Sequence, residues 1–226
     1  MCLPASGKSC LPMESLISES KLFVSREGLS ISFNYRASLI STSSLVRHRI
    51  HQLLMLIGVR RSVPSHLRQI LLSPGPTQTL ADLIQWVTHP KTRLSSCYLT
   101  FCSPTSVLVI ERDLAAVTYR TSDDFLVCTN HDLDMECLTE EELVQLLHTH
   151  GMSGGGVEAI IGDSITRKMC IMRKRQTDRR SLGEVKKWLE EEPVMNETTH
   201  YSCIMDPSAE GGGLVWVRRY PIPPSA

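Results

Sequence analysis

Residues 96–130 read SCYLTFCSPTSVLVIERDLAAVTYRTSDDFLVCTN, and this stretch decides the fold. It holds four short runs rich in apolar and β-branched residues, which is the composition of β-strands. Turn-forming clusters such as Ser-Pro-Thr and Thr-Ser-Asp separate the runs. We therefore predict an antiparallel meander of four strands, at residues 96–102, 106–112, 115–120 and 124–130.

Helices are predicted on both sides of the meander. Three of them begin with a capping-box pattern, in which a Thr or Ser is followed three residues later by an acidic residue, as in Thr79 and Asp82. The predicted helices cover residues 45–58, 64–72, 79–88, 139–150 and 181–191. Residues 151–177 begin with GMSGGG and have the least regular pattern, so we predict no regular element there.

Two further strand regions flank the helices. Residues 29–35, LSISFNY, alternate apolar and polar side chains, which predicts a strand with one buried face. Residues 200–206 and 213–219 predict a hairpin. Because helices and antiparallel strands are segregated along the chain, the fold class is α+β, with helices packed on a sheet. A weakly structured lead occupies residues 1–22, and a Pro-rich tail occupies residues 221–226.

The composition is that of a soluble globular domain, with 42% hydrophobic and 21% charged residues in a chain of 226. The 24 Lys and Arg residues balance the 24 Asp and Glu residues, so no net charge draws the chain to nucleic acid. A basic run, MRKRQTDRR at residues 172–180, has no aromatic stacking partners nearby. We therefore expect no nucleic-acid partner.

No targeting or membrane-spanning segment is expected. The longest apolar run, residues 53–59, is far shorter than the roughly 18 residues of a transmembrane helix. The first 15 residues lack the apolar core of a signal peptide. As it stands, the sequence therefore predicts a cytoplasmic location.

Metal and cofactor sites are also not expected. Cys128, His131 and Cys137 lie close together in the sequence, but their spacing fits no standard zinc pattern and a fourth ligand is absent. Residues 154–156 are three glycines, yet they lack the Lys-Ser/Thr pair of a phosphate-binding loop. The eight cysteines are irregularly spaced in a long chain, so a disulfide scaffold is not expected.

Two polar motifs are candidates for a functional site. Thr129-Asn130-His131-Asp132 follows an apolar run directly, and strand ends are where rigid elements deliver site residues. Asn130 could donate its side-chain N–H to a developing oxyanion, or it could close the strand in an Asx turn. Arg179 could direct its guanidinium at a carbonyl or carboxylate, or it could be ordinary surface charge.

Six sequence landmarks follow one another along the chain. They are REGLSISFNYR at residues 26–36, CYLTFCSPTSVLVIERD at 97–113, VCTNHD at 127–132, TDRRSL at 177–182, EEPVMNETTHYSCIMDP at 191–207 and WVRR at 216–219. Taken in this order, they resemble the acid ceramidase and N-acylethanolamine acid amidase family. The resemblance spans residues 22–220, and the composition of residues 26–72 looks most like fungal members.

The resemblance implies an N-terminal-nucleophile hydrolase with two stacked, mainly antiparallel sheets between helical layers. It implies hydrolysis of a linear lipid N-acyl amide, such as a ceramide or an N-acylethanolamine, to a fatty acid and an amine. In the family, a cysteine at a new N-terminus attacks the amide carbonyl. The resemblance makes Asn130 the oxyanion donor and Arg179 another active-site residue. It also implies access to substrate at a membrane surface, and a lysosomal, vacuolar or secreted location for a longer parent.

Two features depart from the family pattern. The nucleophile segment, Cys-Thr-Ser, should precede Arg26, but residues 1–25 contain only Cys2 and Cys10. Pro4 argues against a strand beginning at Cys2. The chain is therefore interpreted as a C-terminal portion, truncated before the nucleophile, with an incomplete sandwich over residues 23–220. The alternative is a non-catalytic fragment or degenerate paralogue that binds a lipid or a partner. Residues 138–176 form an atypical insertion.

Overall fold

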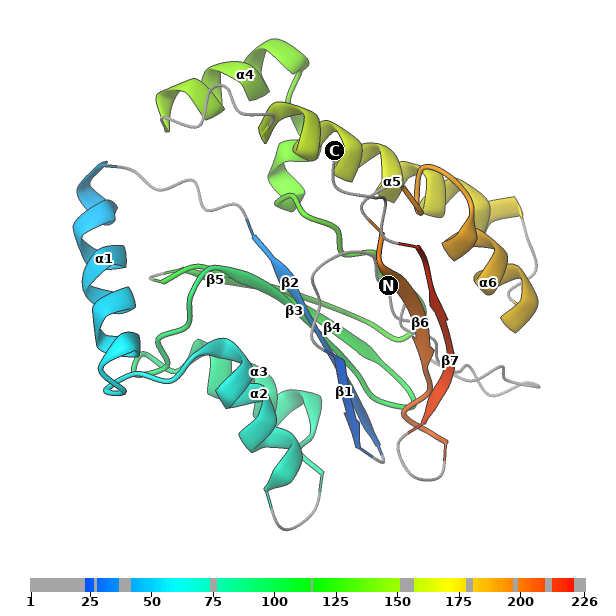
Figure 1. Ribbon diagram of the computed structural model, residues 1–226, viewed down its shortest axis with the longest axis horizontal. Coiled ribbons are helices and arrows are strands. Elements are labelled where there is room, and N and C mark those ends of the chain that lie inside the picture. Colours follow the sequence, from blue (N-terminus) through cyan, green and yellow to red (C-terminus); the bar gives the residue numbers. More distant parts are fainter. Residues whose placement is uncertain are drawn as a thin grey trace.

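The computed structural model describes nine stretches of the chain, in which two antiparallel sheets are flanked by helices (Figure 1). The described stretches are residues 23–26, 28–36, 42–73, 77–114, 116–150, 157–177, 181–196, 199–209 and 213–221. Helices and antiparallel strands in this arrangement confirm the predicted α+β class.

The larger sheet has five strands in the order of the sequence, and each strand is antiparallel to the strands beside it. The strands are β1 (Phe23–Arg26), β2 (Leu29–Tyr35), β3 (Cys97–Cys102), β4 (Val107–Arg112) and β5 (Val117–Ser122). Every residue of β3 and β4 is buried, so both faces of the sheet are covered at its centre. Gly28, with φ at +85°, turns the chain between β1 and β2, and its N–H donates to the carbonyl of Pro207, which lies in the turn after residue 205.

One face of the larger sheet packs on α2 (Val63–Leu72) and α3 (Leu80–Thr88). Thr79 is the predicted cap of α3, and Ser62 caps α2 in the same way, because each accepts a backbone N–H three residues on. Apolar side chains fill the space between the layers; they include Leu29, Ile31, Leu67, Leu83, Leu99, Phe101, Leu108 and Ile110. Buried Arg112 donates to the carbonyls of Val87 and Thr92 at the end of α3.

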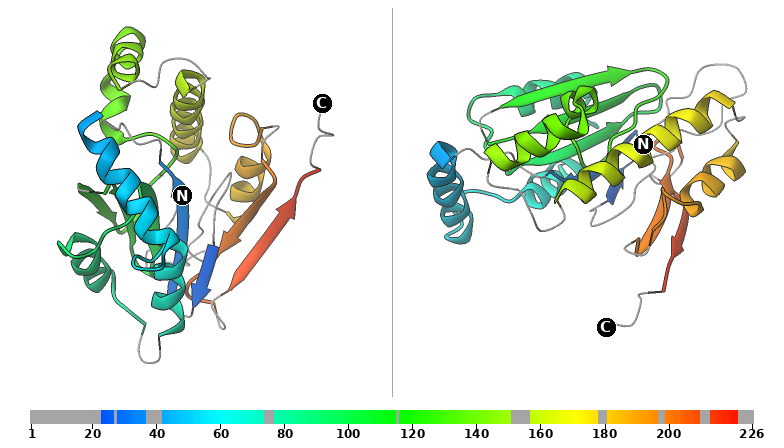
Figure 2. Two further views of the ribbon diagram at one scale, coloured as in Figure 1. Left: turned by 60° about the vertical axis from the view of Figure 1, so that its left-hand side comes forward. Right: turned by 90° about the horizontal axis from the view of Figure 1, so that it is seen from above.

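The opposite face is covered by the smaller sheet and by two helices (Figure 2). The smaller sheet is the predicted hairpin of β6 (Tyr201–Met205) and β7 (Leu214–Arg219), and the helices are α5 (Val157–Thr177) and α6 (Leu182–Glu190). Trp188 of α6 is 1% exposed and packs in one cluster with Val109 and Ile204. Burial of such apolar area on both faces is the main force that holds the layers together.

Three more elements complete the described fold. They are α1 (Thr42–Leu56), the 3-10 helix η1 (Leu133–Cys137) and α4 (Glu140–Thr149). Among the described residues, no helix is both long enough and apolar enough to cross a membrane. Cys102 is disulfide-bonded, whereas Cys97, Cys128, Cys137, Cys170 and Cys203 remain thiols.

Two of the predicted segments differ from the structure. Residues 124–130 do not form the fourth strand of the meander; only Leu126 makes an isolated bridge. The side chains of Phe125 and Val127 are buried in the core. The apolar alternation of this segment therefore reflects burial and not pairing with a neighbouring strand. The region predicted to lack regular structure contains the longest helix, α5, while residues 151–156 lie outside the described part.

The prediction of a single buried face for β2 is also wrong. Ser30, Ser32 and Asn34 are buried, although they lie on the face opposite Leu29 and Ile31. A polar side chain is buried at low cost only where it finds hydrogen-bond partners. This polar face therefore points to a site built on the sheet.

Replacing Leu108 by Ala tests the assignment of the main core. Leu108 is fully buried, so we expect Leu108→Ala to lower the free energy of unfolding by about 2–5 kcal/mol, measured by urea denaturation. Leu56→Ala is the matched control, because Leu56 is 84% exposed and should change stability by less than about 0.5 kcal/mol. Equal effects of the two changes would contradict this core.

Candidate active site

A row of polar side chains crosses four strands of the larger sheet. The register places Asn34 of β2 opposite Tyr98 of β3, Tyr98 opposite Glu111 of β4, and Glu111 opposite Thr118 of β5. Because these residues are direct cross-strand neighbours, their side chains lie on the same face. The row occupies one end of the face whose other end is apolar core.

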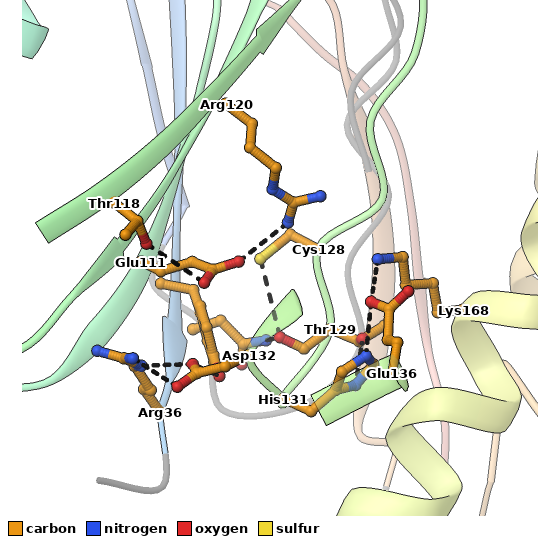
Figure 3. A network of polar contacts seen from close by, with 12 residues as sticks. Arg36, Glu111, Thr118, Arg120, Cys128, Thr129, His131, Asp132, Glu136 and Lys168 are labelled. Atoms are coloured by element: carbon orange, nitrogen blue, oxygen red, sulfur yellow. Dashed lines mark hydrogen bonds and ion pairs between the residues drawn. The ribbon is translucent and has the colours of Figure 1, made fainter. Parts of the chain in front are cut away.

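The loop that carries Thr129-Asn130-His131-Asp132 docks on this row (Figure 3). Arg36, just after β2, donates from Nε to Asp132 Oδ1 at 2.6 Å and from Nη2 to Asp132 Oδ2 at 2.5 Å. Tyr98 donates its hydroxyl to Asp132 Oδ1 at 2.7 Å. The Arg36 guanidinium also lies over the Tyr98 ring. A bidentate pair with a third donor fixes the carboxylate in one orientation.

This cluster changes the acidity of its members. Burial, together with the nearby Asp132 carboxylate, raises the pKa of Tyr98 well above its ordinary value. Burial opposes the charge on Arg36, but the hydrogen bonds and ion pairing with Asp132 outweigh it and raise the pKa of Arg36. Tyr98 therefore stays a hydrogen-bond donor and Arg36 stays a cation at any physiological pH.

Asn130 is held by two elements that are distant in the sequence. Its Nδ2 donates to Asn34 Oδ1 at 3.0 Å, and its backbone N–H donates to Ser164 Oγ of α5 at 2.6 Å. Asn34 Nδ2 in turn approaches the Thr129 carbonyl at 3.4 Å. These contacts orient the Asn130 carboxamide, which remains half-buried at the edge of the site.

His131 is buried against α5. Its Nδ1 lies 2.9 Å from Ser164 Oγ and 3.1 Å from Thr129 Oγ1, and its Nε2 lies 3.0 Å from Glu136 Oε1. Lys168 of α5 forms an ion pair with Glu136. Burial lowers the pKa of His131 despite the Glu136 carboxylate. The ring is therefore neutral at pH 7.

A second acidic group, Glu111 of β4, lies in the row next to β5. Glu111 accepts from Arg120 Nη2 at 3.2 Å and from Thr118 Oγ1 at 3.4 Å. Burial raises the pKa of Glu111 even though Arg120 acts in the opposite direction. The half-buried thiol of Cys128 lies between Arg120 and the loop, 3.8 Å from the Thr129 carbonyl (Figure 3).

A groove of about 510 Å³ opens beside Asp132, between η1 and α4. Both apolar and polar side chains line it: Asp132, Asp134, Met135, Leu138, Glu142, Gln145, Leu146 and Thr149. Its volume lies within the range of about 300–1,000 Å³ that is typical of small-molecule sites.

The site contains some of the predicted residues and several that the sequence did not single out. Asn130 lies in it, whereas Arg179, Cys2 and Cys10 lie outside the described residues. His131 makes no metal cluster with Cys128 and Cys137, and the described residues contain no group of three metal-ligating side chains. Sequence reasoning missed Asn34, Tyr98 and Glu111, since polar residues in a strand are usually read as its solvent face.

No protein-family model matches the sequence, and no curated protein matches it. Among solved structures, the chain is similar to an N-acylethanolamine-hydrolyzing acid amidase (NAAA) ortholog of Caenorhabditis elegans, with a TM-score of 0.64. The two chains share one fold. They are 16% identical, and the match covers 97% of this chain and 98% of the worm chain. At that identity the likeness concerns the fold alone.

This likeness agrees with the sandwich of an N-terminal-nucleophile hydrolase that the sequence landmarks implied. It gives no support to two finer interpretations. The match spans nearly the whole NAAA chain, so it offers no sign that the present chain is only a C-terminal portion. A fungal origin also finds no support in it.

Changing Tyr98 to Phe tests how the loop is held. Tyr98 is 1% exposed and its hydroxyl bonds a carboxylate, so we expect Tyr98→Phe to cost about 1.5–3 kcal/mol of unfolding free energy. Tyr220→Phe is the matched control, because the Tyr220 hydroxyl makes a longer, neutral bond to Ser202 at 3.3 Å. The control should lose less than about 1 kcal/mol. Similar losses in both variants would contradict a special role for the Tyr98–Asp132 bond.

Proposed function

We propose that this chain is a hydrolase of linear lipid N-acyl amides, of the ceramide or N-acylethanolamine type. The observation that carries the proposal is the fold shared with the worm NAAA chain over nearly its full length. The ordered landmarks of the sequence support the same class of reaction. The loop that carries Thr129-Asn130-His131-Asp132 (the Asn130 loop) is held on the buried polar row by hydrogen bonds, so its side chains have fixed positions for catalysis.

In this proposal Asn130 is the oxyanion donor. Amide hydrolysis passes through a tetrahedral intermediate whose oxygen gains negative charge, and a preorganised N–H donor stabilises that charge. The Asn130 carboxamide is fixed by Asn34 on one side, and its backbone is fixed by α5 on the other. Arg179 is proposed as a second polar contact to substrate, on the strength of its motif alone.

The apolar surface of α1 favours access to a lipid substrate. Val46, Ile50, Leu53 and Leu56 are more than half exposed, and exposed Arg47 and Arg49 lie among them. Exposed apolar side chains with arginines among them suit the interface of an anionic membrane. We propose that the substrate is taken from such a surface.

Hydrolysis of the proposed kind needs a nucleophile, and two of the described cysteines do not suit that role. Burial raises the pKa of Cys97 to about 12, and Cys203 is buried, so neither thiol suits nucleophilic attack. The sequence contains no Cys-Thr-Ser run. This favours the second candidate function, a non-catalytic protein of the same fold that binds a lipid or a partner.

Hydrolysis of a fluorogenic N-acyl amide by the purified chain decides between the two. If the chain is a hydrolase, Asn130→Ala should lower kcat by roughly 10²–10³-fold, because one oxyanion donor is lost. Cys2→Ala tests the cysteine nearest the N-terminus, and Cys128→Ala tests the half-buried thiol beside the Thr129-Asn130-His131-Asp132 loop. The change that removes the nucleophile should abolish activity, and the other should not. Cys137→Ala is the control for cysteine removal, since Cys137 is exposed and free.

Each result has a definite meaning. Activity that falls with Asn130→Ala and with one cysteine change supports the hydrolase and identifies its nucleophile. Activity that survives Asn130→Ala within about twofold contradicts the role of Asn130. A complete lack of hydrolysis, in a chain that still binds a lipid amide, supports the non-catalytic alternative.

A further inference from the structure

Helix α5 carries polar side chains on its buried face. Ser164 is completely buried and Lys168 is 8% exposed, and both lie on the same stripe of the helix as the buried Ile161 and Ile171. This stripe faces the Asn130 loop and η1. Polar groups at such positions are costly unless every donor and acceptor is paired, so their hydrogen bonds define what the helix does here.

The Ser164 hydroxyl links Asn130 to His131. Its oxygen accepts the backbone N–H of Asn130 at 2.6 Å, and it lies 2.9 Å from His131 Nδ1. A hydroxyl has one proton to donate. Its oxygen has two lone pairs, so the direction of its contact with Nδ1 depends on the tautomer of the imidazole.

The contact of His131 Nε2 with Glu136 determines which ring nitrogen carries the proton. His131 Nε2 lies 3.0 Å from Glu136 Oε1, and Glu136 is also paired with Lys168. Hydrogen bonds from Lys168 and His131 outweigh burial and lower the pKa of Glu136, so its carboxylate only accepts. The proton of neutral His131 must then sit on Nε2, which leaves Nδ1 as the acceptor for Ser164.

The contacts among Ser164, His131 and Glu136 do not form a catalytic triad. A nucleophilic serine must reach its substrate, but Ser164 is 0% exposed. Its oxygen is also engaged by the Asn130 N–H. The arrangement supports a neighbouring residue and does no chemistry of its own.

We propose that these four side chains form a positioning relay for Asn130. The members of the Asn130 relay are Ser164, His131, Glu136 and Lys168. The proposal rests on the proposed function, because it concerns the placement of the oxyanion donor. It gives α5, which lies almost wholly in the insertion predicted at residues 138–176, a role in the site.

Several charges act on His131, and their balance sets its protonation state. Glu136 and Asp132 favour the protonated ring, whereas Lys168 and, above all, burial oppose it. Since the folded pKa of His131 lies below the unfolded value of about 6.5, neutral His131 contributes its full stability above that pH. The contribution is lost as the pH falls from there through the folded pKa.

Nuclear magnetic resonance of the full chain, labelled with ¹⁵N, tests the relay without any assay of activity. In the wild type, we expect the His131 ring nitrogens to report a neutral imidazole with its proton on Nε2 at pH 6.5. Ser164→Ala removes the acceptor of the Asn130 N–H. We expect hydrogen exchange of that amide to become roughly tenfold faster, the scale of one lost hydrogen bond. Ser164→Thr keeps the hydroxyl and should restore slow exchange.

A second Ser–His pair provides the matched control. Ser95 Oγ lies 3.2 Å from His51 Nε2, so Ser95→Ala should shift the His51 signals and leave Asn130 unchanged. A proton on Nδ1 of His131 in the wild type would overturn the relay. Unchanged exchange at Asn130 in Ser164→Ala would overturn it as well. If the signals behave as expected but no lipid amide is hydrolysed, the proposed function fails while the relay stands.

Discussion

The ion pair between Arg36 and Asp132 is the interaction on which the rest of the site depends. It joins the end of β2 to the loop before η1, two points 96 residues apart in the chain. Both side chains are largely buried, at 15% and 13% exposure, so each charge needs the other. With Asp132 fixed, Asn130 and His131 lie at defined positions over the sheet.

The two faces of the larger sheet have different roles, because one stabilises the fold and the other also carries the candidate site. The face toward α2 and α3 is mainly apolar, with Arg112 near its end, and supplies much of the stabilising burial. The opposite face changes along its strands, from apolar core near Val107 to the polar row at Tyr98 and Glu111. A site at the boundary between the two has a rigid base and a low local dielectric, and both strengthen hydrogen bonds to developing charge.

Local signals predicted most of the fold, because they act over a few residues. The capping boxes at Thr79 and Thr139 begin helices where expected, and the hairpin of β6 and β7 lies where its turn predicted. Helix α5 was missed because its buried face carries Ser164, Arg167 and Lys168, which hide the apolar stripe. Burial of that face depends on partners far away in the chain, and no local pattern reports them.

The candidate site was predicted only in part, for a related reason. Asn130 was found because it follows an apolar run in a recognisable motif. Asn34 and Glu111 were not, because a polar residue in an alternating strand has the same pattern whether water or another layer covers it. The assignment of Arg179 stays a prediction, since it lies outside the described residues.

The most direct test of the account is a double-mutant cycle on Arg36 and Asp132, with each residue changed to Ala singly and then together, and unfolding followed in urea. The Glu190–Arg218 pair, with side chains 31% and 54% exposed, is the surface reference, for which about 0.2–1 kcal/mol is expected. The account predicts a coupling free energy of at least about 2 kcal/mol between Arg36 and Asp132. A coupling no larger than that of the surface pair would contradict the claim that this interaction holds the site together.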